Sequence, residues 1–508
     1  MNSKKERFHL FLSALNDGLT EREDVLYITL LSALAGQNIF LFGPPGTAKS
    51  LIARRIAGVF KSEVYFDYLM QKFSAPEDVF GPISLKKLKE DEYVRKTDGY
   101  LPKADVAFLD EIWKSSPAIL NTLLTIINEK RFKNGRNVEH VPLKFLIAAS
   151  NEIPAPNQGL EALYDRFLAR VEVKPVMDSD TFGDMVLRGK ADDVISLDES
   201  IKVNYAELDK WQREINSVVV SDDVFAILLS VRDKLKNQVY VSDRRWQRCV
   251  YLIKASAFFD DRQETGIADC LLLPFCLWSR PEERPLIERA LYSSMLKEEI
   301  DLGPLYQMLS EFGPDRRFAE TLCRDTVKVK GVEYLKVSIP ETNDFHLLDR
   351  LRRTVELCDH KYENHVLFLP ITKIDDAEWW APLTKDSRDK EFCEIPNVKV
   401  KRCLDGHLLF TTEAYYPLLL YKIRPEVLHR KGAPYQVSIK EHDLFKKYSK
   451  RVRAHMQFIS ETKERLILLA SFIPNSLLSG VIRFFDDESG RCQELLDRCV
   501  DILDKYHE

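Results

Sequence analysis

The chain has 508 residues, of which 45% are hydrophobic and 30% charged, and its formal net charge at pH 7 is −5. This length and composition predict several buried cores, about three domains, and exclude a disordered chain. The slight acidic excess argues against a dedicated binder of nucleic acids or membrane surfaces. Nine dispersed cysteines without a C-x-x-C pair indicate neither a disulfide framework nor a zinc ribbon.

The apolar pattern contains no membrane or export signal. The N-terminus, Met-Asn-Ser-Lys-Lys-Glu-Arg, lacks the long apolar region of a signal peptide. No apolar stretch approaches the length that spans a bilayer. We therefore expect a cytoplasmic protein without a transmembrane segment.

The first third of the chain has the pattern of an α/β domain. Residues 1–36 show helical spacing of leucines, which ends at Gly36. From residue 37 to about 175, short apolar runs alternate with helical segments, which predicts βαβ units and a mostly parallel sheet. The predicted strands are 38–42, 63–68, 106–109, 145–149 and 171–173.

The rest of the chain changes character twice. Residues 188–280 have a helical pattern, and a further helical stretch ends near Gly313 and Pro314. Residues 326–440 switch to short strands and turns, and 441–508 return to amphipathic helix, which we expect to be interrupted at Pro474 and around Gly480 and Gly490. A β-rich segment between helical stretches suggests a module inserted into a helical domain.

A phosphate-binding loop follows the first predicted strand. Residues 43–50 read Gly-Pro-Pro-Gly-Thr-Ala-Lys-Ser. Such a turn can hold backbone N–H groups around anionic oxygens, with the positive end of the next helix dipole at the same place. Lys49 would reach the β- and γ-phosphates, and the Ser50 hydroxyl would bind Mg²⁺. Ala48 replaces the second consensus glycine, and the alternative is an ordinary strand–turn–helix that happens to carry Lys-Ser.

Two acidic residues end the third predicted strand. In Val106-Ala-Phe-Leu-Asp110-Glu111, Asp110 would hold the Mg²⁺ water shell, and Glu111 would orient the water that attacks the γ-phosphorus. A strand that ends in a solvated turn is the alternative. The position of the two acids on the far side of a βα unit favours an NTPase.

Two further polar residues follow at positions where an NTPase could use them to contact the attacking water or the γ-phosphate. Asn151 comes directly after the next core strand and could hydrogen-bond the attacking water or the γ-phosphate; alone, it is more often a turn residue. Arg166, in Leu-Tyr-Asp-Arg-Phe, could serve a neighbouring subunit as an arginine finger. Its alternative role is that of an arginine interacting with a helix dipole.

This ordered set of motifs resembles the AAA+ ATPases of the MoxR family. Within that family, further segments resemble the regulatory ATPase RavA: residues 77–82, residues 99–102, residues 113–114 together with 121–124, and residues 240–246. The resemblance covers roughly residues 15–260, and beyond them it rests on layout alone. It implies an α/β AAA+ P-loop NTPase core with an all-α lid, followed by a C-terminal helical domain interrupted by a small β-rich module.

The resemblance also implies roles for individual residues. Glu111, Lys49, Asn151 and Arg166 would be catalytic, and Ser50 and Asp110 would hold Mg²⁺. The second sensor arginine would be Arg244, with the adjacent Arg245 left open. Residues 74–103 and the Asn-Gly turn in 131–136 would face a central pore. The residues that would contact ATP are Thr20, with its neighbours to Arg22, and Gly43, Gly46, Thr47, Ala48, Lys49, Ser50, Leu51, Ile52, Asp110, Glu111, Asn151, Arg170 and Arg244.

The family further implies a homo-hexameric ring that hydrolyses ATP and remodels or activates a protein partner, frequently a protein with a von Willebrand factor A domain. Two alternatives stay open: an ATP-gated scaffold that presents a bound target, and a nucleic-acid motor, against which the acidic balance counts. We expect five parts: the nucleotide-binding core 1–187, the all-α lid 188–280, a helical segment 281–325, a partner-binding β-rich module 326–440 and a second helical segment 441–508.

Overall fold

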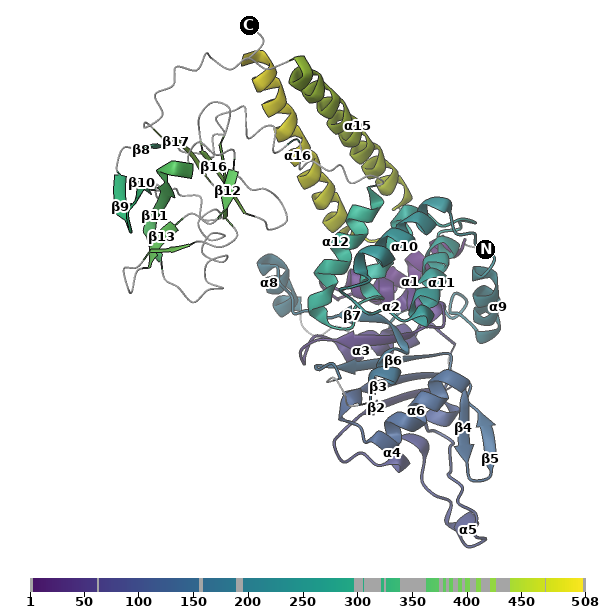
Figure 1. Ribbon diagram of the computed structural model, residues 1–508. Coiled ribbons are helices and arrows are strands. Elements are labelled where there is room, and N and C mark those ends of the chain that lie inside the picture. The colour runs from purple at the N-terminus through teal and green to yellow at the C-terminus, as the bar shows by residue number, and fades with distance from the viewer. Residues whose placement is uncertain are drawn as a thin grey trace. The chain divides into compact units, whose positions relative to one another are not determined.

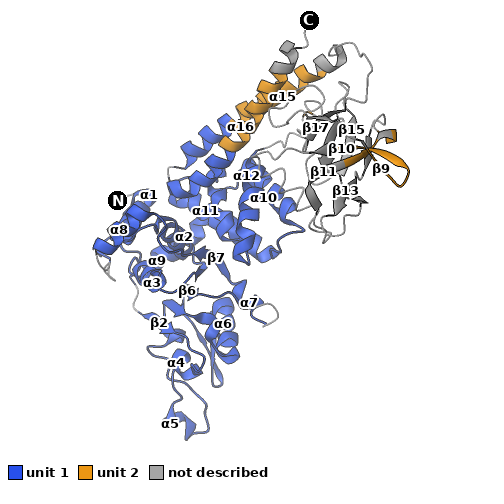
Figure 2. Cartoon of the chain, turned by 90° about the vertical axis from the view of Figure 1, so that its left-hand side faces the viewer, with its two compact units in different colours: residues 1–297, 460–485 blue, residues 298–459, 486–508 orange. Residues whose placement is uncertain are grey.

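The computed structural model describes residues 3–61, 64–154, 159–188, 195–296, 305, 321–323, 326–338, 362–373, 378–380, 383–386, 392–394, 398–402, 408–412, 421–425, 439–470 and 472–505. The chain divides into two compact units (Figure 2). The first comprises residues 1–297 and 460–485, and the second comprises 298–459 and 486–508.

The first unit is built on a five-stranded sheet in the order β2-β3-β6-β1-β7. Every pairing in this sheet is parallel. Because β1 lies between strands that come later in the chain, the carboxyl ends of β1 and its neighbours form the edge at which α/β sheets bind ligands. The strands are β1 (Asn38–Phe42), β2 (Tyr65–Leu69), β3 (Val106–Asp110), β6 (Phe145–Ser150) and β7 (Phe167–Glu172).

The predicted parallel α/β core is confirmed, but the last strand is longer than the sequence pattern indicates. The predicted strand covers only 171–173, whereas β7 begins at Phe167. Arg170 interrupts the apolar run, and its side chain is nevertheless 1% exposed because its guanidinium is hydrogen-bonded inside the protein. Because a charged residue interrupts the apolar pattern, the sequence did not predict the first half of this buried strand.

Helices cover both faces of the sheet. On one face, α6 (Pro117–Glu129) packs its buried Leu120 and Leu123 into a cluster that includes Phe40 of β1. Successive side chains of a strand point to opposite faces, so the buried Ile39 faces the other side, where α2 (Glu23–Leu34) and α3 (Lys49–Ala57) contact the strands. The sheet core is thus apolar on both faces.

A group of helices lies on the β7 side of the sheet (Figure 1). Several of them begin after a residue whose side chain accepts a backbone N–H of the first turn, among them Ser3, Asn204, Ser221 and Ser242. The helices of this part are α1 (Lys4–Asn16), α8 (Ser179–Arg188), α9 (Tyr205–Ile215), α10 (Asp222–Leu235), α11 (Asp243–Phe259), the 3-10 segment η3 (Ile267–Phe275) and α12 (Arg284–Met295).

The opposite end of the unit, beyond β2, carries two projecting segments (Figure 1). One contains α4 (Pro76–Phe80) and α5 (Leu85–Leu88), and the other is the hairpin of β4 (Arg131–Asn134) and β5 (Asn137–His140). The Asn134 side chain joins them, because its Oδ1 accepts the Arg95 N–H at 2.7 Å and its Nδ2 donates to the Arg95 carbonyl at 3.0 Å. The two segments therefore form one supported projection.

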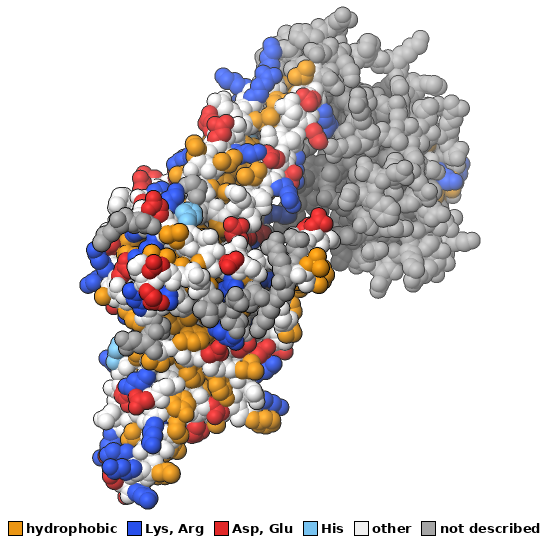
Figure 3. All heavy atoms as spheres, turned by 180° about the vertical axis from the view of Figure 1, so that it is seen from behind, with side chains coloured by type: hydrophobic (Ala, Val, Ile, Leu, Met, Phe, Trp, Pro, Cys, Tyr) orange, Lys and Arg blue, Asp and Glu red, His pale blue; other side chains and the backbone are white. Residues whose placement is uncertain are grey.

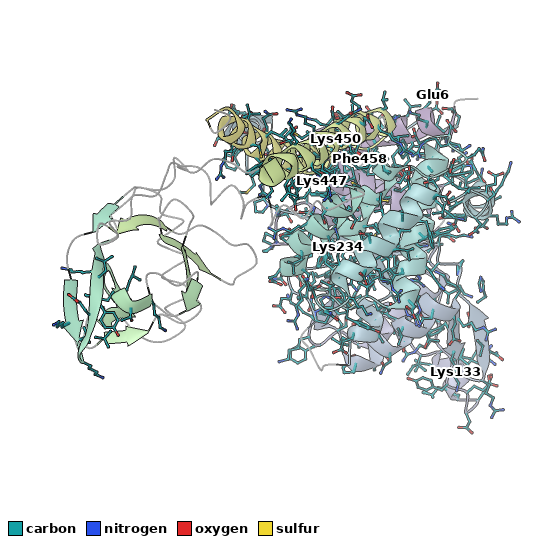
Figure 4. All side chains as sticks on the ribbon, turned by 45° about the horizontal axis from the view of Figure 1, so that its top comes forward. Glu6, Lys133, Lys234, Lys447, Lys450 and Phe458 are labelled. Carbon is teal, nitrogen blue, oxygen red and sulfur yellow. The ribbon has the colours of Figure 1, made fainter. Side chains whose placement is uncertain are left out.

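The projection presents basic side chains at its ends. Lys86 and Lys89 lie exposed in and just after α5, where Figure 3 shows Lys and Arg side chains gathered at the lower end of the unit. Lys133 lies on β4 at the hairpin (Figure 4). Shorter elements nearby are the 3-10 segments η1 (Leu101–Lys103) and η2 (Ile112–Lys114) and the helix α7 (Glu161–Tyr164).

The second unit contains two further five-stranded sheets, in the orders β14-β13-β11-β10-β9 and β12-β15-β16-β17-β8. The predicted small β-rich module is present. Its elements are β8 (Thr321–Cys323), β9 (Thr326–Val329), β10 (Val332–Ser338), β11 (Tyr362–Pro370), η5 (Ile371–Lys373), β12 (Glu378–Trp380), β13 (Leu383–Asp386), β14 (Phe392–Glu394), β15 (Val398–Arg402), β16 (Leu408–Thr412) and β17 (Tyr421–Pro425).

Two long helices end the chain, α15 (Ile439–Leu469) and α16 (Asn475–Lys505), side by side in Figures 1 and 4. Buried residues recur every seven positions along α15, at Phe445, Val452, Ile459 and Leu466, as in helices that pack lengthwise. Lys447 and Lys450 are exposed on the same helix (Figure 4).

The predicted break at Pro474 is confirmed, whereas those at Gly480 and Gly490 are wrong. Helix α16 runs through both glycines. At Gly480 a Cβ would lie 2.9 Å from the Tyr292 hydroxyl oxygen, so the glycine serves a close approach rather than a break. A glycine inside a helix costs only about 1 kcal/mol relative to alanine, which packing of a long amphipathic face offsets.

Across the described ranges, no helix is both long enough and apolar enough to cross a bilayer.

Candidate nucleotide site

The predicted phosphate loop connects the carboxyl end of β1 to α3. Gly43 has φ 156°, and a Cβ there would lie 2.3 Å from the Val173 carbonyl oxygen, so the close approach requires glycine. Ala48, the residue before α3, has φ 70° and ψ 20°, which is the left-handed conformation. This left-handed conformation costs alanine about 1–2 kcal/mol. Ala48 nevertheless adopts it at the position where the consensus has glycine.

Lys49, the first residue of α3, lies folded over the loop. Its Nζ donates hydrogen bonds to the carbonyls of Gly43 at 2.7 Å and Pro44 at 2.8 Å. The side chain is buried, and this burial lowers the pKa of Lys49, while the charges of Asp110 and Glu111 act in the opposite direction. The ammonium is therefore held at the loop, close to two carboxylates.

The predicted acidic pair lies beside α3. The Ser50 hydroxyl donates to Asp110 Oδ2 at 3.3 Å, and Asp110 Oδ1 accepts the backbone N–H of Glu111 at 3.0 Å. Glu111 has φ 52°, and its Oε2 lies 3.4 Å from both the Ser150 hydroxyl and the Lys114 ammonium. The structure thus brings together groups from α3, β3 and β6 at one edge of the sheet.

These groups fit a magnesium–nucleotide complex. A hydroxyl and a carboxylate supply the hard oxygen ligands that Mg²⁺ prefers, and this ion usually keeps several waters and takes further ligands from substrate phosphates. Ser50 and Asp110 are the residues that would hold the ion.

The remaining residues expected around the phosphates lie at the same edge. Thr47 donates its hydroxyl to the Pro44 carbonyl at 2.9 Å, which closes the turn, and Ile52 is buried in the first turn of α3 with Leu51 half-buried beside it. Asn151 is exposed directly after β6. The two neighbouring strand ends therefore carry the lysine and the amide toward one site.

The segment expected at the adenine also lies at this carboxyl edge. The Glu21 carboxylate accepts the backbone N–H groups of Met177 at 2.9 Å and Asp178 at 3.0 Å, in the chain that leaves β7. Thr20 is half-buried, and Arg22 is buried with one N–H on the Glu21 carbonyl. Residues 20–22 therefore lie beside the chain that leaves β7, and their contact with adenine stays a prediction.

Arg166 lies at the opposite edge of the sheet. It immediately precedes β7, and its carbonyl accepts the Nδ2 of Asn38, the first residue of β1, at 3.5 Å. The phosphate loop follows Phe42 at the other end of β1, about 13 Å away for a strand rising 3.3 Å per residue. Arg166 is thus separated from its own loop by the length of a strand.

The structure distinguishes the adjacent arginines that the sequence left open. Arg245 is 3% exposed, forms an ion pair with Asp165 at 3.1 Å and donates to the carbonyls of Leu168 and Cys276. Arg244 is exposed, and its charge lowers the pKa of Arg166 after the larger effect of burial. Arg244 therefore lies near Arg166 at the amino edge, and Arg245 holds α11 on β7.

Arg170 lies inside the protein rather than at the carboxyl edge. Its guanidinium stacks 3.7 Å above the Tyr164 ring and donates to the carbonyls of Tyr164 and Trp278. Burial lowers the pKa of Arg170 to about 9. These contacts attach the end of η3 to β7, and a contact between Arg170 and nucleotide stays a prediction.

Three residues to which the sequence assigned no role contact predicted site residues. Ser150 and Lys114 contact Glu111, and Arg248 donates to the Arg166 carbonyl at 3.3 Å. For Arg248, the available signal was its spacing of one helical turn from Arg244.

Comparisons with known proteins agree with this geometry. Residues 6–213 match the model of the MoxR domain in the MoxR-vWA-beta-propeller ternary systems, and residues 223–291 match an AAA lid domain. A crystal structure of a candidate ATPase from Cytophaga hutchinsonii covers 57% of this chain and 94% of its own, with a TM-score of 0.47 and 18% identity, values too low to carry an argument.

Similar sequences come from archaea and an archaeal virus. Two uncharacterized proteins of Methanocaldococcus jannaschii are 37% and 33% identical, over 55% and 63% of this chain and 72% and 84% of their own lengths. A structural protein of Acidianus two-tailed virus is 32% identical over 34% of this chain and 29% of its own. The two domain matches, with the site and lid described above, show that this chain belongs to the MoxR family of AAA+ ATPases.

Proposed function

We propose that the protein hydrolyses ATP in a ring of identical subunits, each completing the site of its neighbour, and that this activity remodels or activates a protein partner. The observation that carries the proposal is the placement of Arg166 and Arg244 at the amino edge of the sheet, opposite the loop that binds phosphate. ATPase activity itself is what membership of the AAA+ family supports.

Within one subunit, the carboxyl edge binds the substrate. The loop N–H groups and Lys49 would hold the β- and γ-phosphates, and Ser50 and Asp110 would hold a magnesium ion, which would neutralise developing charge. Glu111 accepts a proton from the attacking water and aligns it, and Asn151 hydrogen-bonds the same water or the γ-phosphate. Ser150 and Lys114 fix the Glu111 carboxylate at its working position.

A second subunit supplies the arginines that stabilise the negative charge on the γ-phosphate. Neither Arg166 nor Arg244 can cross the length of β1 to its own γ-phosphate. When the amino edge of one subunit meets the carboxyl edge of the next, both arginines come within reach of the neighbour's nucleotide. An interface between two different faces of the same chain repeats head to tail and closes into a ring, and six subunits is the number that the resemblance implies.

The partner is a protein that contains a von Willebrand factor A domain. The supporting observation is the description of the matched family model, which is the MoxR domain in the MoxR-vWA-beta-propeller ternary systems. The projection of α4, α5 and the β4–β5 hairpin carries exposed Leu85 and Leu88 among lysines, a surface suited to grip a polypeptide. The five-part division of the chain stays part of this proposal, with 326–440 as the partner-binding module.

Mixed rings test the proposal. Lys49→Ala removes nucleotide binding and Arg166→Ala removes the finger, so each variant alone has less than about 1% of the wild-type ATPase rate. Mixed in equal amounts, an Arg166→Ala subunit receives an intact Arg166 from a Lys49→Ala neighbour, and part of the rate returns. Mixed rings that are visible by native mass spectrometry but inactive would contradict the trans arrangement.

Glu111→Gln, which binds ATP without hydrolysing it, traps the ring and its partner for identification.

A further inference from the structure

Three arginines crowd together at the amino edge of β1 and β7. Arg166 precedes β7, and Arg244 and Arg248 lie one turn apart on α11. Arg248 Nη1 donates to the Arg166 carbonyl at 3.3 Å. The Nε of Arg166 is buried and finds no acceptor among the described residues. The cluster therefore contains one buried donor, the Arg166 Nε, that has no partner in the described part of the subunit.

The cluster has little negative charge to balance it. Asp165 is the carboxylate that acts on Arg248, and its oxygens are already engaged by Arg245 at 3.1 Å and the Ser242 hydroxyl at 3.1 and 3.2 Å. Burial lowers the pKa of Arg248 most, and the charges of Arg166 and Arg244 lower it further. The half-buried guanidinium groups of Arg166 and Arg248 and the exposed one of Arg244 thus repel one another.

The excess positive charge continues onto the end of α6. Lys130, which has φ 52° and directly follows this helix, is half-buried within range of the charges of Arg248 and Lys144. Burial, followed by the charges of these two residues, lowers the pKa of Lys130 to about 8. Lys144 has its own partner, Asp209, at 3.0 Å. Arg248 is therefore surrounded by cations from α6, α11 and the start of β7.

An anion from outside the subunit would balance the excess positive charge around Arg248. Guanidinium groups bind phosphate oxygens through charged hydrogen bonds, which are about twice as strong as neutral ones, and several donors at fixed positions recognise a terminal phosphate. We propose that Arg248 is a positioning residue of the trans site, which holds the backbone at Arg166 and completes the cationic surface that receives the γ-phosphate of ATP on the neighbouring subunit. This inference rests on the proposed function.

Replacement of Arg248 by glutamine tests the inference. The loop and Lys49 of the neighbour bind ATP, so KM for ATP stays within about twofold. We expect kcat to fall roughly 10- to 100-fold, the range for loss of a charged hydrogen bond. Arg248→Lys retains the charge and restores part of kcat. The thermal midpoint stays the same or rises, because like-charge repulsion is relieved.

Arg232→Gln on α10 is the matched control, since Arg232 is exposed and outside the cluster, and its kcat stays at the wild-type value. A wild-type kcat for Arg248→Gln would overturn the inference. So would a thermal midpoint that falls together with kcat in both the glutamine and the lysine variants, since that pattern denotes a structural role.

Mixed rings separate this inference from the proposed function. If mixtures of Arg166→Ala and Lys49→Ala regain activity, the trans arrangement stands, and mixtures of Arg248→Gln and Lys49→Ala must regain activity as well. If the first mixture recovers and the second does not, Arg248 acts within its own subunit and only the present inference fails. If neither recovers, the proposed function fails.

Discussion

At the scale of single residues, backbone conformation decides how the phosphate loop departs from its consensus. Ala48 adopts φ 70°, a conformation that glycine enters freely and alanine enters at some cost. The residue has no bulk beyond Cβ, so the loop retains the geometry that its N–H groups need. The substitution changes the energy of the loop and leaves its shape intact.

Two replacements at this position have opposite effects. Ala48→Gly removes the left-handed cost, although greater freedom of the unfolded chain offsets part of the gain, so stability rises by about 0–1 kcal/mol and ATP binding is retained. Ala48→Val places a β-branched residue at positive φ and weakens ATP binding at least about tenfold. Titration with a fluorescent ATP analogue measures both. Equal affinity in the valine variant would show that the loop does not depend on this conformation.

At the scale of elements, the open edge of β7 determines how the lid is attached. Edge carbonyls need hydrogen-bond donors, and Arg245 donates to Leu168 while the Trp278 indole donates to the Arg170 carbonyl at 3.1 Å. Because α11 and the segment that follows η3 provide these donors, both are tied to the sheet by buried polar contacts. The adjacent Arg244 takes no part in this attachment.

The adjacent arginines should therefore respond differently to the same change. Arg245→Gln leaves Asp165 without its buried cation and lowers the free energy of unfolding by about 3–5 kcal/mol. Arg244→Gln changes stability by no more than about 0.5 kcal/mol and lowers the ATPase rate at least about tenfold. Urea unfolding and steady-state kinetics of both variants check this. A loss of stability in Arg244→Gln would mean that the two residues share one structural role.

At the scale of the whole molecule, the proposed function divides the active site between two edges of one sheet. The carboxyl edge carries the loop, Asp110 and Glu111, and the amino edge carries Arg166 and Arg244. Under this proposal, one subunit alone cannot bring its own arginines to its own nucleotide. We therefore propose that catalysis depends on assembly rather than on closure of one subunit.

Activity per subunit should therefore rise with protein concentration. Below the dissociation constant of the ring, the rate falls at least 100-fold, since an arginine finger contributes several powers of ten. ATPase assays over a dilution series, paired with analytical ultracentrifugation, test this. A constant rate per subunit across the transition from rings to monomers would contradict a divided site.

The linear sequence determined the chemistry of the carboxyl edge, because the phosphate loop, the acidic pair and Asn151 each lie directly after a strand and their order is readable along the chain. It also determined the parallel core and the β-rich module, whose periodic patterns are local. Local patterns failed where distant contacts set the outcome. Arg170 concealed half of β7 because Tyr164 and Trp278 bury its charge, and Gly480 stays helical because it packs on Tyr292. Only the tertiary structure separated Arg244 from Arg245 and placed Arg248 beside Arg166, because side chains remote in sequence determine which guanidinium groups are buried and which remain available to a neighbour.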